Sequence, residues 1–148
     1  MKKNFKKYGL GCLLMVTLFL PQTGCTNQDS RSSNEKIVIA VYTAYEKKDW
    51  NMLTSLFGEG FTFTSPFDDH IDIKEYKVRC WPNCNNIAKF NIDKLVVDGD
   101  NVYVTYTCLT KNNKVFHNTE LFELAGGKIK DFTCYFGPGI GFPNNTTK

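Results

Sequence analysis

The sequence predicts an α+β domain in which N-terminal helices are followed by an antiparallel sheet. Apolar side chains in residues 35–57 recur at the spacing of amphipathic helices. Residues 87–136 instead contain four apolar runs separated by short turns, which is typical of consecutive strands. Because short turns join neighbouring antiparallel strands, the four strands are expected to form a meander.

Residues 1–24 are predicted to be a lipoprotein signal peptide. Lysines precede an apolar run over residues 8–20 that is too short to cross a bilayer comfortably. Gly24 and Cys25 follow, and they resemble the end of a bacterial lipobox, although Gln22 stands where an aliphatic residue is usual. The alternative is ordinary signal-peptide cleavage without a lipid. We expect lipidation of Cys25, which would anchor the protein in the membrane of the bacterial cell envelope, facing the periplasm or the exterior.

The rest of the chain is expected to hold one domain. Residues 25–34 read as a polar tether, residues 35–137 as the domain and residues 138–148 as an irregular tail. Without the four lysines of the leader, 14 basic side chains remain against 15 acidic ones. The domain therefore lacks the basic excess that a nucleic-acid partner requires, and we expect no such partner.

Two helices are expected at the start of the domain. Ser32 and Glu35 have the spacing of a capping box, from which the first helix runs to about Lys48. Asp49 is predicted to cap a second helix over residues 50–57.

A strand, a polar turn and a third helix are expected next. Residues 61–64 alternate Phe and Thr as a half-buried strand does, and Pro66 ends the run because proline donates no ladder hydrogen bond. Residues 67–70 are predicted to form an acidic turn, and Asp72 to cap the helix after it. Polar groups packed between aromatic side chains suit the rim of a small-molecule pocket. The four strands of the meander are then expected at residues 87–97, 102–110, 115–124 and 128–136.

Four segments of the chain, in this order, resemble the SnoaL-like branch of the NTF2-like superfamily: AVYTAYEKKDWNMLTSLF, FTFTSPFDDH, HNTELFELAGGKIKDF and TCYFG. The resemblance covers residues 37–137. It implies a cone, with a curved antiparallel sheet wrapped around N-terminal helices and an internal pocket. The superfamily includes isomerases, cyclases, hydrolases, dehydratases, transport factors and binding domains, so the resemblance does not decide the activity.

Comparison with the ketosteroid isomerases of this superfamily argues against their chemistry. When their second-helix Asp is aligned with Asp49, their catalytic base falls on Ser65 and their oxyanion-binding Tyr falls on Val41. Tyr42 is one residue away, which turns it by about 100° around a helix. An alcohol side chain cannot replace a carboxylate base without an activator of its own.

The strand over residues 115–124 places one carboxylate on its apolar face. Phe122 and Leu124 are expected to face the core, and Glu120 and Asn118 share their parity. A carboxylate there is costly unless it is hydrogen-bonded or borders a wet cavity. Two roles are therefore open for Glu120. It is structural, held by Asn118, a Tyr hydroxyl or a backbone N–H, or it has a raised pKa and faces a ligand.

The leading interpretation is a domain that binds a small, largely apolar ligand without a cofactor. The alternatives are a SnoaL-like cyclase, hydrolase or isomerase, with Glu120, Asp69 or His70 as candidate acid/base groups, and an interaction module. No metal site is expected, because His117 is predicted to lie on the opposite face of the sheet. The predicted ligand-binding residues are Glu120, Asn118, Phe63, Phe67, Trp81, Tyr106 and Tyr135. A homodimer or partner surface is predicted on the outer sheet face, with Tyr103, Thr105, His117 and Thr119.

The cysteines after the leader have different expected roles. Cys80 and Cys84 flank a turn that could bring their thiols together as a disulfide in an oxidising compartment. Cys108 and Cys134 are expected on strands separated by a third, too far apart to bond, and both are predicted to be buried.

Overall fold

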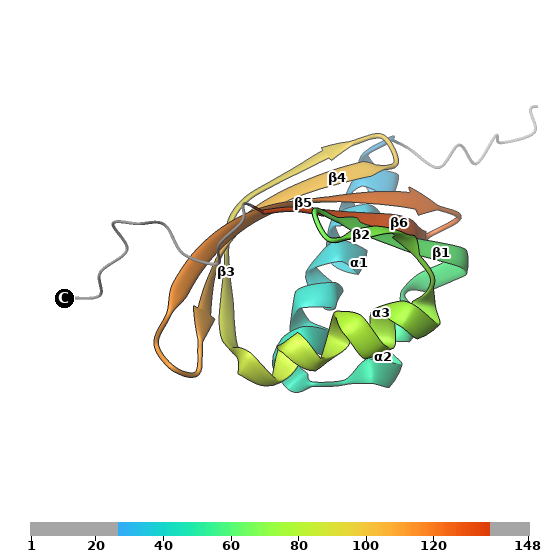
Figure 1. The fold of residues 1–148 in the computed structure, drawn as a ribbon. Coiled ribbons are helices and arrows are strands. Elements are labelled where there is room, and N and C mark those ends of the chain that lie inside the picture. The colour runs from blue at the N-terminus through green and yellow to red at the C-terminus, as the bar shows by residue number, and fades with distance from the viewer. Residues whose placement is uncertain (1–26, 137–148) are drawn as a thin grey trace, which may run out of the picture.

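The computed structural model describes residues 27–136, which form a curved six-stranded sheet arching over three helices (Figure 1). The strand order is β2-β1-β6-β5-β4-β3. The leader, Cys25 and the predicted C-terminal tail lie outside the described residues. The elements are α1 (Asn27–Lys47), α2 (Trp50–Ser55), β1 (Phe57–Ser65), β2 (Asp68–Ile71), α3 (Ile73–Arg79), the 3-10 helix η1 (Trp81–Asn86), β3 (Ile87–Asp98), β4 (Asn101–Thr110), β5 (Val115–Ala125) and β6 (Lys128–Tyr135).

The predicted α+β cone is confirmed, but the sheet is mixed rather than wholly antiparallel. Strands β3 to β6 form the expected antiparallel meander. Strand β1 instead pairs with β6 in parallel, with Phe63 opposite Phe132. No tight turn joins β1 to β6, because β2, α3, η1 and β3 to β5 lie between them in the chain. Hairpin geometry therefore does not impose an antiparallel direction on this pair.

Helix α1 begins at Asn27, before the capping box expected at Ser32 and Glu35. Most of the segment predicted as a tether is therefore helical. Asp29 lies in the first turn, where the N-terminal end of a helix dipole favours a negative charge. The second helix begins as predicted, since the Asp49 side chain accepts a hydrogen bond from the Met52 amide at 2.8 Å.

Two boundaries differ from the expected ones. Helix α2 ends at Ser55, and Phe57 already belongs to β1. The segment expected as an acidic turn forms β2, which pairs antiparallel with β1 through Phe63 and Ile71. Asp72 caps α3 as predicted, accepting hydrogen bonds from the amides of the two residues that follow Ile73.

The helices fill the concave side of the sheet and leave part of it open. Val38, Val41 and Ala44 of α1 are almost fully buried. Tyr76 of α3 is fully buried, and its ring lies edge-on to Phe63 with 4.8 Å between centroids. Aromatic side chains therefore form much of the contact between helices and sheet.

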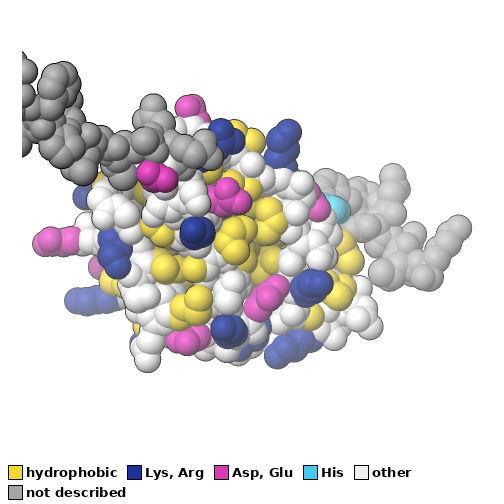
Figure 2. Space-filling model, turned by 180° about the vertical axis from the view of Figure 1, so that it is seen from behind, with side chains coloured by type: hydrophobic (Ala, Val, Ile, Leu, Met, Phe, Trp, Pro, Cys, Tyr) yellow, Lys and Arg dark blue, Asp and Glu magenta, His cyan; other side chains and the backbone are white. Residues whose placement is uncertain are grey.

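Charges of both signs are interspersed on the face seen in Figure 2, together with apolar side chains. No helix within residues 27–136 is both long and apolar enough to cross a membrane. On the outer face of the sheet, Tyr103 is 43% exposed and Tyr135 is 54% exposed. The homodimer through this face stays a prediction.

Cys108 and Cys134 are buried as predicted, whereas Cys80 is only half-buried. Cys80 and Cys84 are free thiols in this structure, so the disulfide suggested for them is not formed.

Alkylation should separate these thiols. In the folded protein we expect iodoacetamide to modify Cys80 before Cys108 and Cys134, because the last two are shielded from the reagent. The reaction at Cys80 should itself be slow, since burial raises its pKa to about 12 and keeps the thiolate scarce. Peptide mass spectrometry before and after unfolding in urea measures the order. Rapid labelling of Cys108 and Cys134 in the native state would contradict their placement.

Candidate functional site

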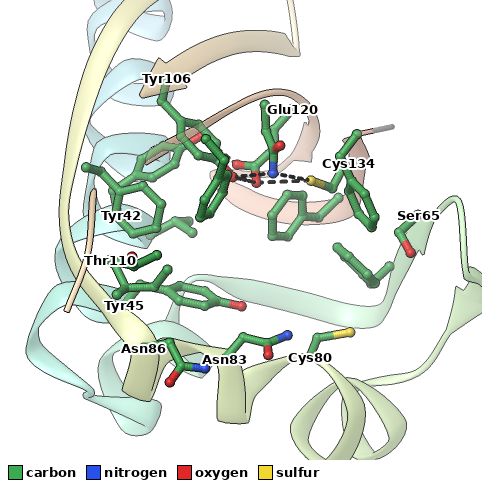
Figure 3. Close-up of a pocket in the computed structure, with 18 of the residues that line it drawn as sticks. Tyr42, Tyr45, Ser65, Cys80, Asn83, Asn86, Tyr106, Thr110, Glu120 and Cys134 are labelled. Carbon is green, nitrogen blue, oxygen red and sulfur yellow. Dashed lines mark hydrogen bonds between the residues drawn. The ribbon is translucent and has the colours of Figure 1, made fainter. Parts of the chain in front are cut away.

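A cavity of about 630 Å³ lies between the concave face of the sheet and the helices (Figure 3). Its walls come from α1, β1, β2, α3, η1 and the strands of the meander. Aromatic side chains dominate these walls, and polar groups gather at a few places. This volume and lining are typical of sites that bind small molecules.

Glu120 lies in the cavity wall and is only 5% exposed. Its Oε2 accepts a hydrogen bond from the Tyr42 hydroxyl at 2.7 Å. Its Oε1 accepts from the Tyr106 hydroxyl at 2.8 Å and from the Cys134 thiol at 3.4 Å. We call these four side chains the carboxylate cluster; they come from β5, α1, β4 and β6 (Figure 3).

The sheet register brings the strand members of the cluster together. Glu120 is directly opposite Cys134 on β6, and residues opposite each other share a face. Asn118 is opposite Tyr106 on β4, and its side-chain amide donates to the Tyr106 hydroxyl at 3.0 Å. Of the partners predicted for Glu120, the Tyr hydroxyls are the ones that bind its carboxylate. Asn118 donates to the Tyr106 hydroxyl instead, so the proton of that hydroxyl is directed to Glu120.

Burial raises the pKa of Glu120 from 4.5 to about 6, and the hydrogen bonds from Tyr42, Tyr106 and Cys134 limit this rise. Burial and the nearby carboxylate raise the pKa of all three donors, so each keeps its proton at neutral pH. At pH 7 the cluster is therefore an ionised carboxylate that faces neutral donors.

The charge of Glu120 should make stability depend on pH. Because the folded-state pKa is raised, the native protein binds this proton more tightly than the unfolded chain. The resulting stabilisation is complete below pH 4.5 and is lost as pH rises through 6, a loss of about 2 kcal/mol. Glu120→Gln should lack this dependence, since its Oε1 can keep two donors while its amide donates to Tyr42.

Urea unfolding from pH 4.5 to pH 7.5 measures this difference. Glu123→Gln is the matched control, because Glu123 is an exposed residue of the same strand. Equal pH dependence in wild type and Glu120→Gln would show that Glu120 titrates normally.

Not all predicted ligand-binding residues line the cavity. Phe63 and Tyr106 are buried in its wall, and Phe67 lines it from the surface with 70% exposure. Trp81 is not among the lining residues, and its ring packs edge-on against that of Tyr45, which does line the cavity, with 5.0 Å between centroids. Tyr135 does not line this cavity either. A register shift in β6 turns Cys134 inward, which leaves Tyr135 on the outer face.

The candidate acid/base groups on β2 do not reach the cavity. The side chains of Asp69 and His70 are exposed, with their polar atoms 2.5 Å apart, and neither lines the cavity. Asp68 lines it instead, because the pairing of β1 with β2 shifts register between Phe63 and Ser65. The Asp68 carboxylate accepts from the Ser65 hydroxyl at 2.7 Å and lies 2.6 Å from the Arg79 guanidinium.

Tyr42 lines the cavity, although the comparison with ketosteroid isomerases placed their tyrosine at Val41 and Tyr42 about 100° around the helix. Val41 and Tyr42 both line the cavity, with exposures of 1% and 5%. Helix α1 packs against β3, β4 and α2, so two neighbouring side chains about 100° apart around the helix can both face the interior. Within residues 27–136, no group of three or more His, Cys, Asp or Glu side chains is arranged to hold a metal ion.

A curved sheet over helices, with a carboxylate buried in the wall of an internal cavity, defines a cone-shaped α+β domain. The chain belongs to the family of SnoaL-like domains, which its residues 38–132 match. The resemblance expected from the four sequence segments is therefore confirmed. No curated protein matches the chain in sequence.

Solved structures share the fold at low identity. An NTF2-like protein of unknown function from Cytophaga hutchinsonii has a TM-score of 0.57 and 21% identity, covering 79% of this chain and 95% of that one. A candidate SnoaL-like polyketide cyclase from Jannaschia sp. CCS1 has 0.62 and 14%, covering 75% and 90%. An LEH-like epoxide hydrolase of M. tuberculosis has 0.60 and 16%, covering 72% and 84%. These likenesses concern the fold alone.

Proposed function

We propose that this protein is a cell-envelope lipoprotein whose SnoaL-like domain binds a small, largely apolar ligand in the cavity. The observation that carries the proposal is the carboxylate cluster, a hydrogen-bonded polar group in the wall of a largely aromatic cavity of about 630 Å³. Aromatic walls supply apolar contact area, and one polar group fixes the orientation of a ligand. Tyr106 and Glu120 orient the ligand, and Phe63 and Phe67 contact its apolar part.

The partners of both cavity carboxylates favour binding over proton transfer. Glu120 already accepts three hydrogen bonds, and Asp68 is paired with Arg79. A general base must reach the proton that it removes. A carboxylate surrounded by donors from the protein is better suited to holding a hydrogen-bond donor in place.

Acid/base catalysis by Glu120 is the second candidate, and one observation favours it. Its pKa of about 6 lies near neutral pH, where a proton-transferring group works best. An epoxide hydrolase and a candidate polyketide cyclase share the fold. The exposed positions of Asp69 and His70 remove them from this candidate mechanism.

Native mass spectrometry of the gently purified protein tests binding. We expect a noncovalent adduct that is lost on denaturation and reduced in Glu120→Gln but not in Glu123→Gln. Nile red, a neutral apolar dye, should also gain fluorescence with the protein. The absence of both an adduct and a dye signal contradicts the proposal. A bound compound whose mass changes over time in wild type but not in Glu120→Gln supports the enzyme instead.

Anchoring has its own test. In cells fed a palmitate analogue, wild type should become labelled and Cys25→Ser should not, because the thiol of Cys25 would carry the diacylglycerol. Cys12→Ser is the control, since Cys12 lies within the expected signal peptide. Label on Cys25→Ser, or an unlabelled wild type cut at another residue, disproves the anchor.

A further inference from the structure

We propose that the cavity selects ligands whose apolar skeleton carries a protonated amine, and that this amine lies between Glu120 and the aromatic side chains around it. The inference rests on the proposed binding function and names the ligand class for the same cavity. It draws on the charge at Glu120, the hydrogen-bond capacity left there, and the aromatic surroundings.

The charge of Glu120 has no cationic partner within residues 27–136. Its hydrogen-bond partners are two hydroxyls and a thiol, and no Lys, Arg or His side chain in the described part of the chain forms an ion pair with it. Two cationic residues line the cavity elsewhere. Arg79 is paired with Asp68 at 2.6 Å, and Lys114 is exposed beyond the end of β4. A buried negative charge without a counter-ion attracts a ligand cation strongly, because little water screens it.

The hydrogen-bond capacity at Glu120 also calls for a donor. A carboxylate has about four acceptor sites, and Tyr42, Tyr106 and Cys134 occupy three of them. One site remains, and an ionised carboxylate has no proton to donate. A ligand carbonyl or carboxylate would therefore meet another acceptor, whereas an ammonium group supplies a charge-assisted hydrogen bond.

Three aromatic side chains lie together beside this carboxylate: Tyr42 and Tyr106 donate to it, and Phe90 packs against both. The ring centroids of Tyr42 and Phe90 are 5.1 Å apart, those of Tyr42 and Tyr106 are 5.4 Å apart, and those of Phe90 and Tyr106 are 5.1 Å apart. All three residues line the cavity, and their rings meet edge to face. Aromatic faces attract cations, and more strongly where water is excluded.

The cavity wall also includes polar groups that favour a ligand of different charge. Asn83 and Asn86 of η1 lie across the cavity from Glu120 in Figure 3, and Lys114 also lines the cavity. An anionic ligand would be drawn to Lys114 and repelled by Glu120. A comparison of a cation, a neutral molecule and an anion with the same skeleton therefore shows whether Glu120 or Lys114 determines the preferred ligand charge.

Calorimetric titration at pH 7.5 makes this comparison with 2-(1-naphthyl)ethylamine, 1-ethylnaphthalene and 1-naphthaleneacetic acid. The full chain is used in nanodiscs of zwitterionic lipid, with empty nanodiscs as blanks. We expect the amine to have the lowest Kd, about tenfold or more below the other two. Glu120→Gln should reduce this preference to about twofold or less, mainly by raising the Kd of the amine. Glu123→Gln should behave as wild type.

The outcomes separate this inference from the function beneath it. If the neutral compound or the acid binds wild type as tightly as the amine, the amine preference is disproved while the binding function stands. Persistence of the preference in Glu120→Gln disproves the role of Glu120. If none of the three compounds binds wild type, both the inference and the binding function are contradicted. The wild-type comparison alone decides the preference, even if Glu120→Gln folds poorly.

Discussion

Replacing Tyr42 and Tyr106 together by Phe should lower the free energy of unfolding at pH 7.5 by about 2–4 kcal/mol. Each hydroxyl donates to Glu120, so the double variant leaves this buried carboxylate with only the Cys134 thiol. Glu120 can then take up a proton instead of staying ionised, and this uptake limits the cost. At pH 5 the wild-type carboxyl is already largely protonated, so the loss should be smaller there.

Urea unfolding at the two pH values measures this loss, and a carbon NMR titration of Glu120 should show a further rise of its pKa. Tyr103→Phe is the control, because Tyr103 is on the outer face and 43% exposed. That variant should change the free energy of unfolding by less than about 0.5 kcal/mol at either pH. Equal losses at pH 5 and pH 7.5 in the double variant would mean that the hydroxyls act by packing and not on the carboxylate.

Phe122→Ala should destabilise the fold by about 3–5 kcal/mol. Phe122 is fully buried, and its ring stacks on that of Phe132 with 4.5 Å between centroids. Removing it creates a cavity next to the carboxylate cluster, since Phe122 also lies edge-on to Tyr42. The change in the urea midpoint at constant slope gives the loss.

Phe67→Ala removes the same side chain from an exposed position and provides the comparison. Phe67 is 70% exposed, so its loss should cost less than about 0.5 kcal/mol. Because Phe67 lines the cavity, the same change should weaken Nile red binding. A loss below about 1 kcal/mol for Phe122→Ala would show that this part of the core collapses to fill the space.

Local patterns in the sequence predicted the features that depend on neighbouring residues. The parity of Phe122 and Leu124 placed Glu120 on the inner face, and the Asp49 and Asp72 caps located two helix starts. Capping and alternation are decided within a few residues, so they can be read without knowing the rest of the fold.

The features that the sequence did not predict depend on contacts between distant segments. The parallel pairing of β1 with β6 joins strands far apart in the chain, and no local signal gives its direction. Asp68 lines the cavity and Asp69 does not, because the register of β2 shifts against β1. Cys134 lines it and Tyr135 does not, because the register of β6 shifts against β5. Strand parity predicts faces only while the register is unbroken.

The hydrogen bond between Tyr42 and Glu120 links residues that are 78 positions apart. The hairpins of the meander close over short turns, so their formation costs far less chain entropy than the contact between Tyr42 and Glu120. They can therefore form early in folding. Docking of α1 against the sheet then completes the cavity wall. A ligand can therefore bind only chains in which this long-range step has occurred. We expect a bound ligand to slow unfolding while leaving the rate of folding nearly unchanged.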